Sequence, residues 1–140
     1  MLDYSKIYSE SQIKTATPAK LVEMLYEGGV RFLKEARKAL ENKDYVTANE
    51  KLKRVQDIVM ELNVSLDMEK GGVIAQNLRS LYNYMFQRLL DANIKKNIEI
   101  VDEILGYMET LLEVWREAMK KAGPSVTTQT SQQSGLDLSV

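Results

Sequence analysis

Apolar side chains recur at alternating spacings of three and four residues along most of the chain, which is the pattern of helices that bury one face. The clearest run begins at Tyr45 and continues without a break through Ala48, Leu52, Val55, Val59, Leu62 and Leu66. Residues 18–40, 74–93 and 98–122 show the same period. The pattern therefore predicts four amphipathic helices.

Polar and helix-breaking residues mark the expected helix ends. Thr17 is a suitable N-cap, and Pro18 fits the first helical position because its missing N–H would be unpaired there in any case. Asp44 and Asn97 are the expected caps of the second and fourth helices, and Gly71-Gly72 is expected to end the second. Connections this short force consecutive helices to run antiparallel. The predicted fold is therefore an all-α, up-down-up-down four-helix bundle.

The two ends of the chain differ in composition from the middle. Residues 17–122 are expected to form the bundle. Residues 123–140 are rich in Ser, Thr, Gln and Gly, and this tail is predicted to be disordered because it has too few apolar groups to fold. Residues 1–16 contain Ile7 and Tyr8 but are too short and too polar to hold a helix alone. They form either a removable cap that rests on the bundle or a disordered terminus, and both interpretations stay open.

The composition argues against an enzyme. The chain has no cysteine, which excludes a disulfide framework and a thiolate metal site. It also has no histidine, the commonest general base and the commonest metal ligand. A carboxylate-bridged oxidase of the ferritin type would need Glu-x-x-His pairs, and no glycine-rich loop is present to hold a nucleotide phosphate. We therefore predict no catalytic site, no metal and no cofactor.

The charges nearly cancel, with 19 basic and 20 acidic side chains, so we expect no nucleic-acid partner. No apolar run approaches the length of a membrane span and no leader is visible, which predicts a cytoplasmic protein without membrane insertion. Residues 31–54 are predominantly basic and residues 99–117 predominantly acidic. These are either neighbouring solvated helix faces of opposite sign or a charged docking patch, and we favour the first.

Several apolar residues lie outside the expected buried stripes. Residues 98–119 carry a second, overlapping stripe, which we assign to the core in preference to a partner surface. Tyr84 and Phe86 lie on opposite flanks of the third helix, where core and partner surface are about equally plausible. Gly28-Gly29 lies in the middle of the first helix and indicates either close helix packing, which we favour, or a shallow surface for another chain.

The order of several short motifs resembles that of one known family. The motifs are residues 65–72, 74–78, 81–85 and 89–93, preceded by Tyr8, residues 15–18, Leu21 and residues 24–26, and followed by Trp115. Their order and spacing resemble those of the flagellin-specific secretion chaperones, the FliS family. The resemblance covers about residues 4 to 120, and it implies the same four-helix bundle.

The resemblance also implies a function. It indicates a cytosolic export chaperone that binds the C-terminal region of flagellin, prevents its premature polymerisation and helps deliver it to the flagellar export gate protein. It implies a displaceable cap at Ile7 and Tyr8. It implies a flagellin-binding groove at Tyr26, Leu62, Leu66, Ile74, Leu78, Tyr82 and Met85. We expect a monomer or a weak homodimer. The alternative is a generic helical-bundle adaptor that binds some other amphipathic helix.

Overall fold

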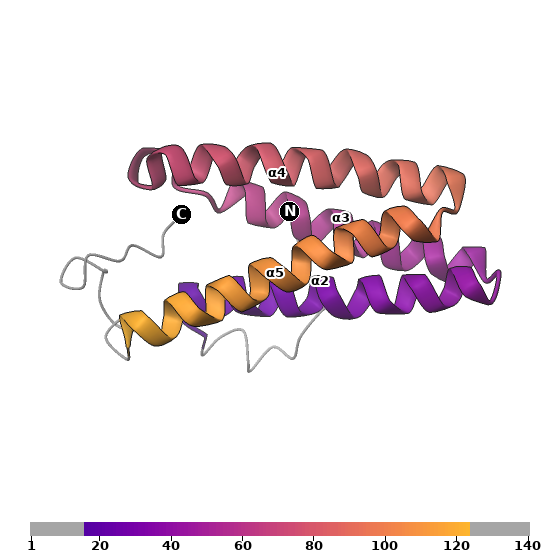
Figure 1. The fold of residues 1–140 in the computed structure, drawn as a ribbon, viewed down its shortest axis with the longest axis horizontal. Coiled ribbons are helices and arrows are strands. Elements are labelled where there is room, and N and C mark those ends of the chain that lie inside the picture. The colour runs from indigo at the N-terminus through magenta and orange to yellow at the C-terminus, as the bar shows by residue number, and fades with distance from the viewer. Residues whose placement is uncertain (1–15, 124–140) are drawn as a thin grey trace.

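The structure is a computed structural model, which describes residues 16–123 as an antiparallel bundle of four helices (Figure 1). The helices are α2 (Pro18–Glu41), α3 (Tyr45–Val64), α4 (Met68–Lys95) and α5 (Ile98–Ala122). α2 packs mainly on α3 and α5, and α4 packs on the same two helices from the other side. The predicted all-α four-helix fold is confirmed. Ile7, Tyr8 and the tail after Gly123 lie outside the described residues, so the predicted cap and the predicted tail disorder stay predictions.

The predicted N-caps form as expected. The Thr17 side chain accepts a hydrogen bond from the backbone N–H of Lys20 at 3.1 Å, and Pro18 occupies the first turn. Asp44 accepts from the N–H of Thr47, and Asn97 accepts from the N–H of Ile100, each at 3.1 Å. Each cap satisfies a backbone donor that the helix leaves unpaired, which stabilises a helix by about 1 kcal/mol.

The prediction that Gly71-Gly72 ends the second helix is wrong. α3 ends at Val64, and the side chain of Asp67 caps α4 by accepting a hydrogen bond from the N–H of Lys70 at 3.0 Å. Gly72 lies one turn inside α4, where its φ of 53° and ψ of −129° kink the helix. Only glycine adopts that conformation without strain. Leu66 is buried even though it is not helical, which is why the apolar period ran past the true helix end.

The second apolar stripe of α5 belongs to the core. Val101, Met108 and Trp115 are buried, and the other members of the stripe are partly buried against them. Those partly buried residues are Ile98, Leu105, Leu112 and Met119. The favoured interpretation of this stripe is confirmed.

Gly29 marks a close approach between α2 and α5. A Cβ atom added at Gly29 would lie 2.8 Å from Cε of Met108, a side chain that is itself fully buried. Close helix packing, the favoured interpretation of the paired glycines, is therefore confirmed at Gly29. Gly106, in the exposed part of α5, is the opposite case, because a Cβ there would meet nothing within 4 Å.

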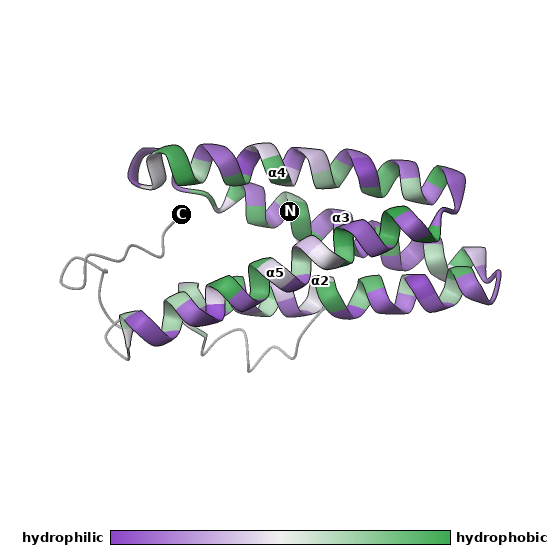
Figure 2. Ribbon diagram, viewed as in Figure 1, coloured by the Kyte–Doolittle hydropathy of each residue, from purple (hydrophilic) through white to green (hydrophobic). Residues whose placement is uncertain are grey.

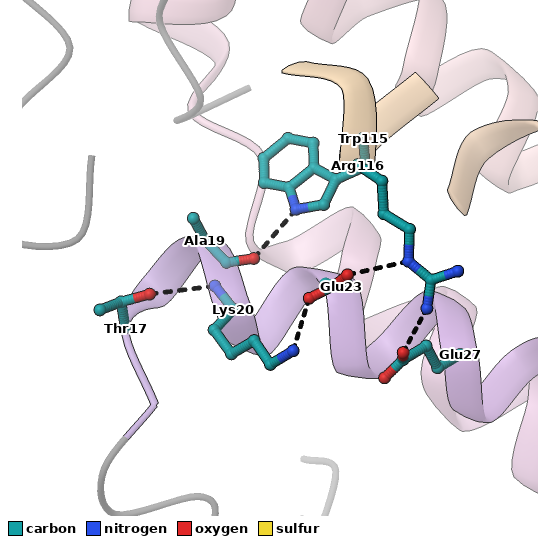
Figure 3. A network of polar contacts seen from close by, with 7 residues as sticks. All are labelled: Thr17, Ala19, Lys20, Glu23, Glu27, Trp115 and Arg116. Atoms are coloured by element: carbon teal, nitrogen blue, oxygen red, sulfur yellow. Dashed lines mark hydrogen bonds and ion pairs between the residues drawn. The ribbon is translucent and has the colours of Figure 1, made fainter. Parts of the chain in front are cut away.

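A row of ion pairs joins α2 to α5. Arg37 binds Asp102 at 2.6 Å, and Lys34 lies 4.0 Å from Glu109. Nearer the start of α2 the signs reverse. Figure 3 shows Arg116 of α5 bridging the carboxylates of Glu23 and Glu27. The basic half of α2 thus faces acidic α5 residues, as expected for neighbouring helix faces of opposite charge.

We predict opposite effects of alanine at the two glycines. Gly106→Ala should stabilise the protein by about 1 kcal/mol, since alanine is the better helix former and fits without contact. Gly29→Ala gains the same propensity but must displace Met108, and overpacking costs about 1–3 kcal/mol. Urea denaturation of both variants tests this prediction. Equal stabilisation by the two alanines would show that α2 and α5 are not closely packed at Gly29.

A second prediction concerns pH. Burial raises the pKa of Glu23, but hydrogen bonds from Lys20 and Arg116 outweigh it, so the net pKa lies below the ordinary value. The unfolded chain then binds a proton at higher pH than the folded one. The contribution of ionised Glu23 to the free energy of unfolding is therefore complete above the pKa that Glu23 has in the unfolded chain. It is lost as the pH falls through the pKa of Glu23 in the folded protein. Glu23→Gln should cost about 1–2 kcal/mol near neutral pH and almost nothing in strong acid. A cost that does not vary with pH would contradict this.

Candidate functional site

Most of the seven residues predicted for the groove lie in the core. Ile74 is the exception, with 61% of its surface exposed, while Leu78 is partly buried. The other five are buried: Tyr26, Leu62, Leu66, Tyr82 and Met85. Most of the predicted groove residues therefore belong to the core in this structure, and Ile74 is the one member of the set that is largely exposed.

Tyr26 and Tyr82 meet inside the bundle. Their hydroxyl oxygens lie 2.5 Å apart, and the two side chains come from α2 and α4. Burial raises the pKa of both phenols, so both stay protonated at neutral pH. The two hydroxyls therefore bond each other and are not presented to a partner.

Trp115 extends this contact to α5. Its indole Nε1–H donates to the backbone oxygen of Ala19 at 2.9 Å, as Figure 3 shows. Its ring also meets the ring of Tyr26 edge to face, with centroids 6.4 Å apart. The contacts of Tyr26, Tyr82 and Trp115 thus connect α2, α4 and α5 through buried polar and aromatic groups.

A shallow pocket of about 310 Å³ opens between α3 and α4. Val59 and Tyr82 are its buried members, and Met60 is half-exposed at its mouth. The remaining lining residues are Asn63, Asn83, Phe86 and Gln87. We call this the α3–α4 pocket. It combines apolar walls with side-chain amides, which suits an apolar side chain carried on a peptide backbone.

The amides of the α3–α4 pocket are held in place. Asn63 donates from Nδ2 to Oδ1 of Asn83 at 2.9 Å, which joins the two helices. Arg79 donates to Oδ1 of Asn63 at 3.2 Å and to its backbone oxygen at 3.3 Å. The pocket edge is therefore ordered before any partner binds.

The other side of α4, facing α5, is less completely covered. α4 and α5 share the least extensive of the four main helix interfaces, and Figure 1 shows α5 leaving α4 as it runs toward the start of α2. By helical geometry, Ile74, Leu78 and Leu81 continue the side of α4 on which Tyr84 contacts Glu103 of α5.

Leu111 and Val114 continue the matching side of α5. Val114 is 60% exposed, similar to Ile74. We call these five residues the α4–α5 face: Ile74, Leu78, Leu81, Leu111 and Val114. Figure 2 shows a strongly hydrophobic band near the start of α4, just after its hydrophilic first turn.

The sequence indicated only part of this site. Phe86 was recognised as an apolar residue outside the core stripes, but nothing in the sequence pattern pointed to the bonded amides of Asn63 and Asn83. Within residues 16–123, no group of three or more acidic side chains is arranged to hold a metal ion. None of the helices described is long and apolar enough to cross a bilayer.

The fold and these surfaces place the chain among small antiparallel helical bundles with an apolar surface on either side of one helix. Comparison with known proteins is more specific. The model of the family described as flagellar protein FliS matches residues 1–122, and the chain belongs to this family.

Three relatives, each named flagellar secretion chaperone FliS, show the extent of the similarity. The Salmonella typhimurium protein is 38% identical over 120 residues, which is 85% of this chain and 89% of that protein. The Campylobacter jejuni protein is 41% identical, over 79% of this chain and 86% of its own length. The Bacillus subtilis protein is 34% identical, over 81% and 84% respectively.

We predict that the two buried tyrosines are strongly coupled. Tyr26→Phe alone should destabilise the protein by about 1–3 kcal/mol, because it leaves the Tyr82 hydroxyl buried without its partner. Adding Tyr82→Phe removes that unpaired group and should recover part of the loss. A double-mutant cycle by urea denaturation measures the coupling. Additive losses would show that the two hydroxyls do not depend on each other.

Proposed function

We propose that this chain is a cytoplasmic export chaperone for flagellin. It binds the C-terminal region of flagellin, keeps that region from polymerising and helps deliver it to the flagellar export gate protein. Membership of the FliS family over residues 1–122 carries this proposal. The relatives bear the name flagellar secretion chaperone, which supports a flagellar client. The proposal includes no enzymatic step and no cofactor.

The proposed mechanism is sequestration of apolar side chains. The α4–α5 face offers Ile74, 61% exposed, and Val114, 60% exposed, with partly buried leucines beside them. Burying such side chains stabilises a complex by about 25 cal/mol per Å² of apolar surface, less the cost of ordering the client. The α3–α4 pocket would accept a further client side chain on the opposite side of α4.

The seven predicted groove residues then divide by role. Ile74 and Leu78 would contact the client directly. The buried residues would support that surface from below: Tyr26, Leu62, Leu66, Tyr82 and Met85. In the same proposal, Ile7 and Tyr8 anchor a segment that covers the client surface when flagellin is absent.

Flagellin binding tests this proposal. A peptide of the C-terminal region of flagellin should bind with a negative heat-capacity change and with little dependence on salt, as measured by calorimetry. Ile74→Asp and Val114→Asp change exposed positions and should each weaken binding by about tenfold or more. Val46→Asp, at a more exposed apolar position on α3, is the matched control and should bind normally.

The cap is tested with the same peptide. If the cap covers the client surface, only the fraction of molecules with an open cap can bind the peptide. Deleting residues 1–16 should therefore tighten binding by the inverse of that fraction. Unchanged affinity in both aspartate variants, with the proteins folded by circular dichroism, would contradict the α4–α5 face as the client surface. Weaker binding after the deletion would show instead that Ile7 and Tyr8 contact the client.

A further inference from the structure

Two tyrosines are fixed on the surface between α4 and the first half of α5. The hydroxyls of Tyr84 and Tyr107 both donate to Oε2 of Glu103, at 2.5 and 3.2 Å. Arg88 donates from Nε to the other oxygen of that carboxylate at 3.1 Å. The rings meet edge to face with centroids 6.3 Å apart. The polar groups of these four side chains are therefore hydrogen-bonded to one another.

Both rings remain partly open to solvent. Tyr84 is 44% exposed and Tyr107 is 37% exposed, although aromatic side chains of this size usually bury most of their area. Because the hydroxyl bonds already hold both rings, docking a partner would cost less side-chain entropy than ordering free tyrosines. Tyrosine and arginine are also the residue types that dominate the energetics of protein interfaces.

Gly106, next to Tyr107, is a second and independent observation. A glycine in the middle of an exposed helix costs about 1 kcal/mol relative to alanine. Gly29 has a packing reason for its missing side chain, but at Gly106 an added Cβ would meet nothing within 4 Å. The absence of a side chain leaves room for another backbone to approach α5 closely beside the exposed rings.

The charges around the rings favour a cation. Hydrogen bonds from Tyr84 and Arg88 help hold the pKa of Glu103 below its ordinary range, so this carboxylate stays ionised. Arg88 is a cation in the same cluster, but it is paired with Glu103 and lies 3.7 Å from Asp91. Glu99 and Glu113 are exposed on α5, whereas Arg116 is turned toward α2. In the described part of the chain, cations lie over the rings of Phe32 and Tyr45, but none covers Tyr84 or Tyr107.

We propose that Tyr84, Tyr107 and Gly106 form a docking surface for an arginine-bearing helix of a partner protein. The guanidinium would stack on the electron-rich ring faces, as arginine does in cation–π contacts. The partner helix would lie against α5 at Gly106. This surface lies between the second half of α4 and the first half of α5, about three turns from the connection that joins them. The α4–α5 face adjoins it, one turn nearer the start of α4 at Leu81, and we assign a different occupant to each surface.

The test uses a designed alanine-rich helix that carries arginines on one face and a fluorescent label. The full chain should bind it, and the same helix with glutamine for arginine should bind about tenfold more weakly or worse, by fluorescence anisotropy. Tyr84→Ala combined with Tyr107→Ala should lower affinity for the arginine helix by about tenfold. Tyr45→Ala, at a tyrosine exposed to the same degree, should leave it unchanged.

Gly106→Leu separates binding from folding. Leucine is the better helix former and its Cβ would meet nothing within 4 Å, so this variant should be more stable than the wild type in urea. This variant should nevertheless not bind the arginine helix, because the leucine side chain would occupy the space that the partner backbone needs. No binding by the wild type, equal binding of the two designed helices, or normal binding by Gly106→Leu would each overturn the proposal.

Competition decides whether this surface is separate from the client surface. A saturating concentration of the flagellin peptide should leave the arginine helix bound. Displacement of the arginine helix would assign the rings to the client surface and overturn the separate site. The binding of the arginine helix is measured without flagellin, so a failure to bind flagellin has no bearing on this result.

Discussion

The hydrogen bond between Tyr26 and Tyr82 is the constraint on which the arrangement of the helices depends. Hydrophobic burial is non-directional, and it would tolerate small rotations of α4 against α2. Two buried hydroxyls that bond each other do not, because a shift would leave both unpaired at a cost of about 1–3 kcal/mol each. Trp115 fixes α5 at the same level through Ala19 and the Tyr26 ring.

The surfaces outside the core follow from this constraint. With Tyr82 facing inward, helical geometry directs Ile74 and Leu81 toward the α5 side of α4. α5 is tied along its length to α2 by Asp102, Glu109 and Arg116, whereas within residues 16–123 its polar contacts with α4 centre on Glu103. α5 therefore follows α2 and diverges from the first half of α4, which leaves an apolar row partly uncovered (Figure 1).

Features that depend on local chemistry could be predicted from the sequence. Predictions failed where the same apolar pattern fits two different structures. Caps such as Thr17 and Asp44 were predictable because each acts within one turn. The α3–α4 connection was not, because Leu66 continues the apolar period while lying outside the helix. The sequence could not distinguish groove residues from core residues for a related reason. The same spacing of three and four residues marks every inward-facing stripe, and whether a residue is buried depends on which helix packs against it. The hydrogen bond between Asn63 and Asn83 was not predictable, because it leaves no periodic pattern in the sequence.

A bundle that presents apolar surface must take its stability from elsewhere. Here ion pairs join α2 to α5 and a buried hydrogen bond joins Tyr26 to Tyr82, and both lie away from the exposed Ile74 and Val114. The kink at Gly72 lies just before the exposed turn that carries Ile74, so a local change there need not disturb Tyr82 two turns further on. A client that covers the α4–α5 face binds only the folded chain and stabilises it by mass action. Under the proposed function, the free chain is therefore less stable than the complex, because only the complex buries the α4–α5 face.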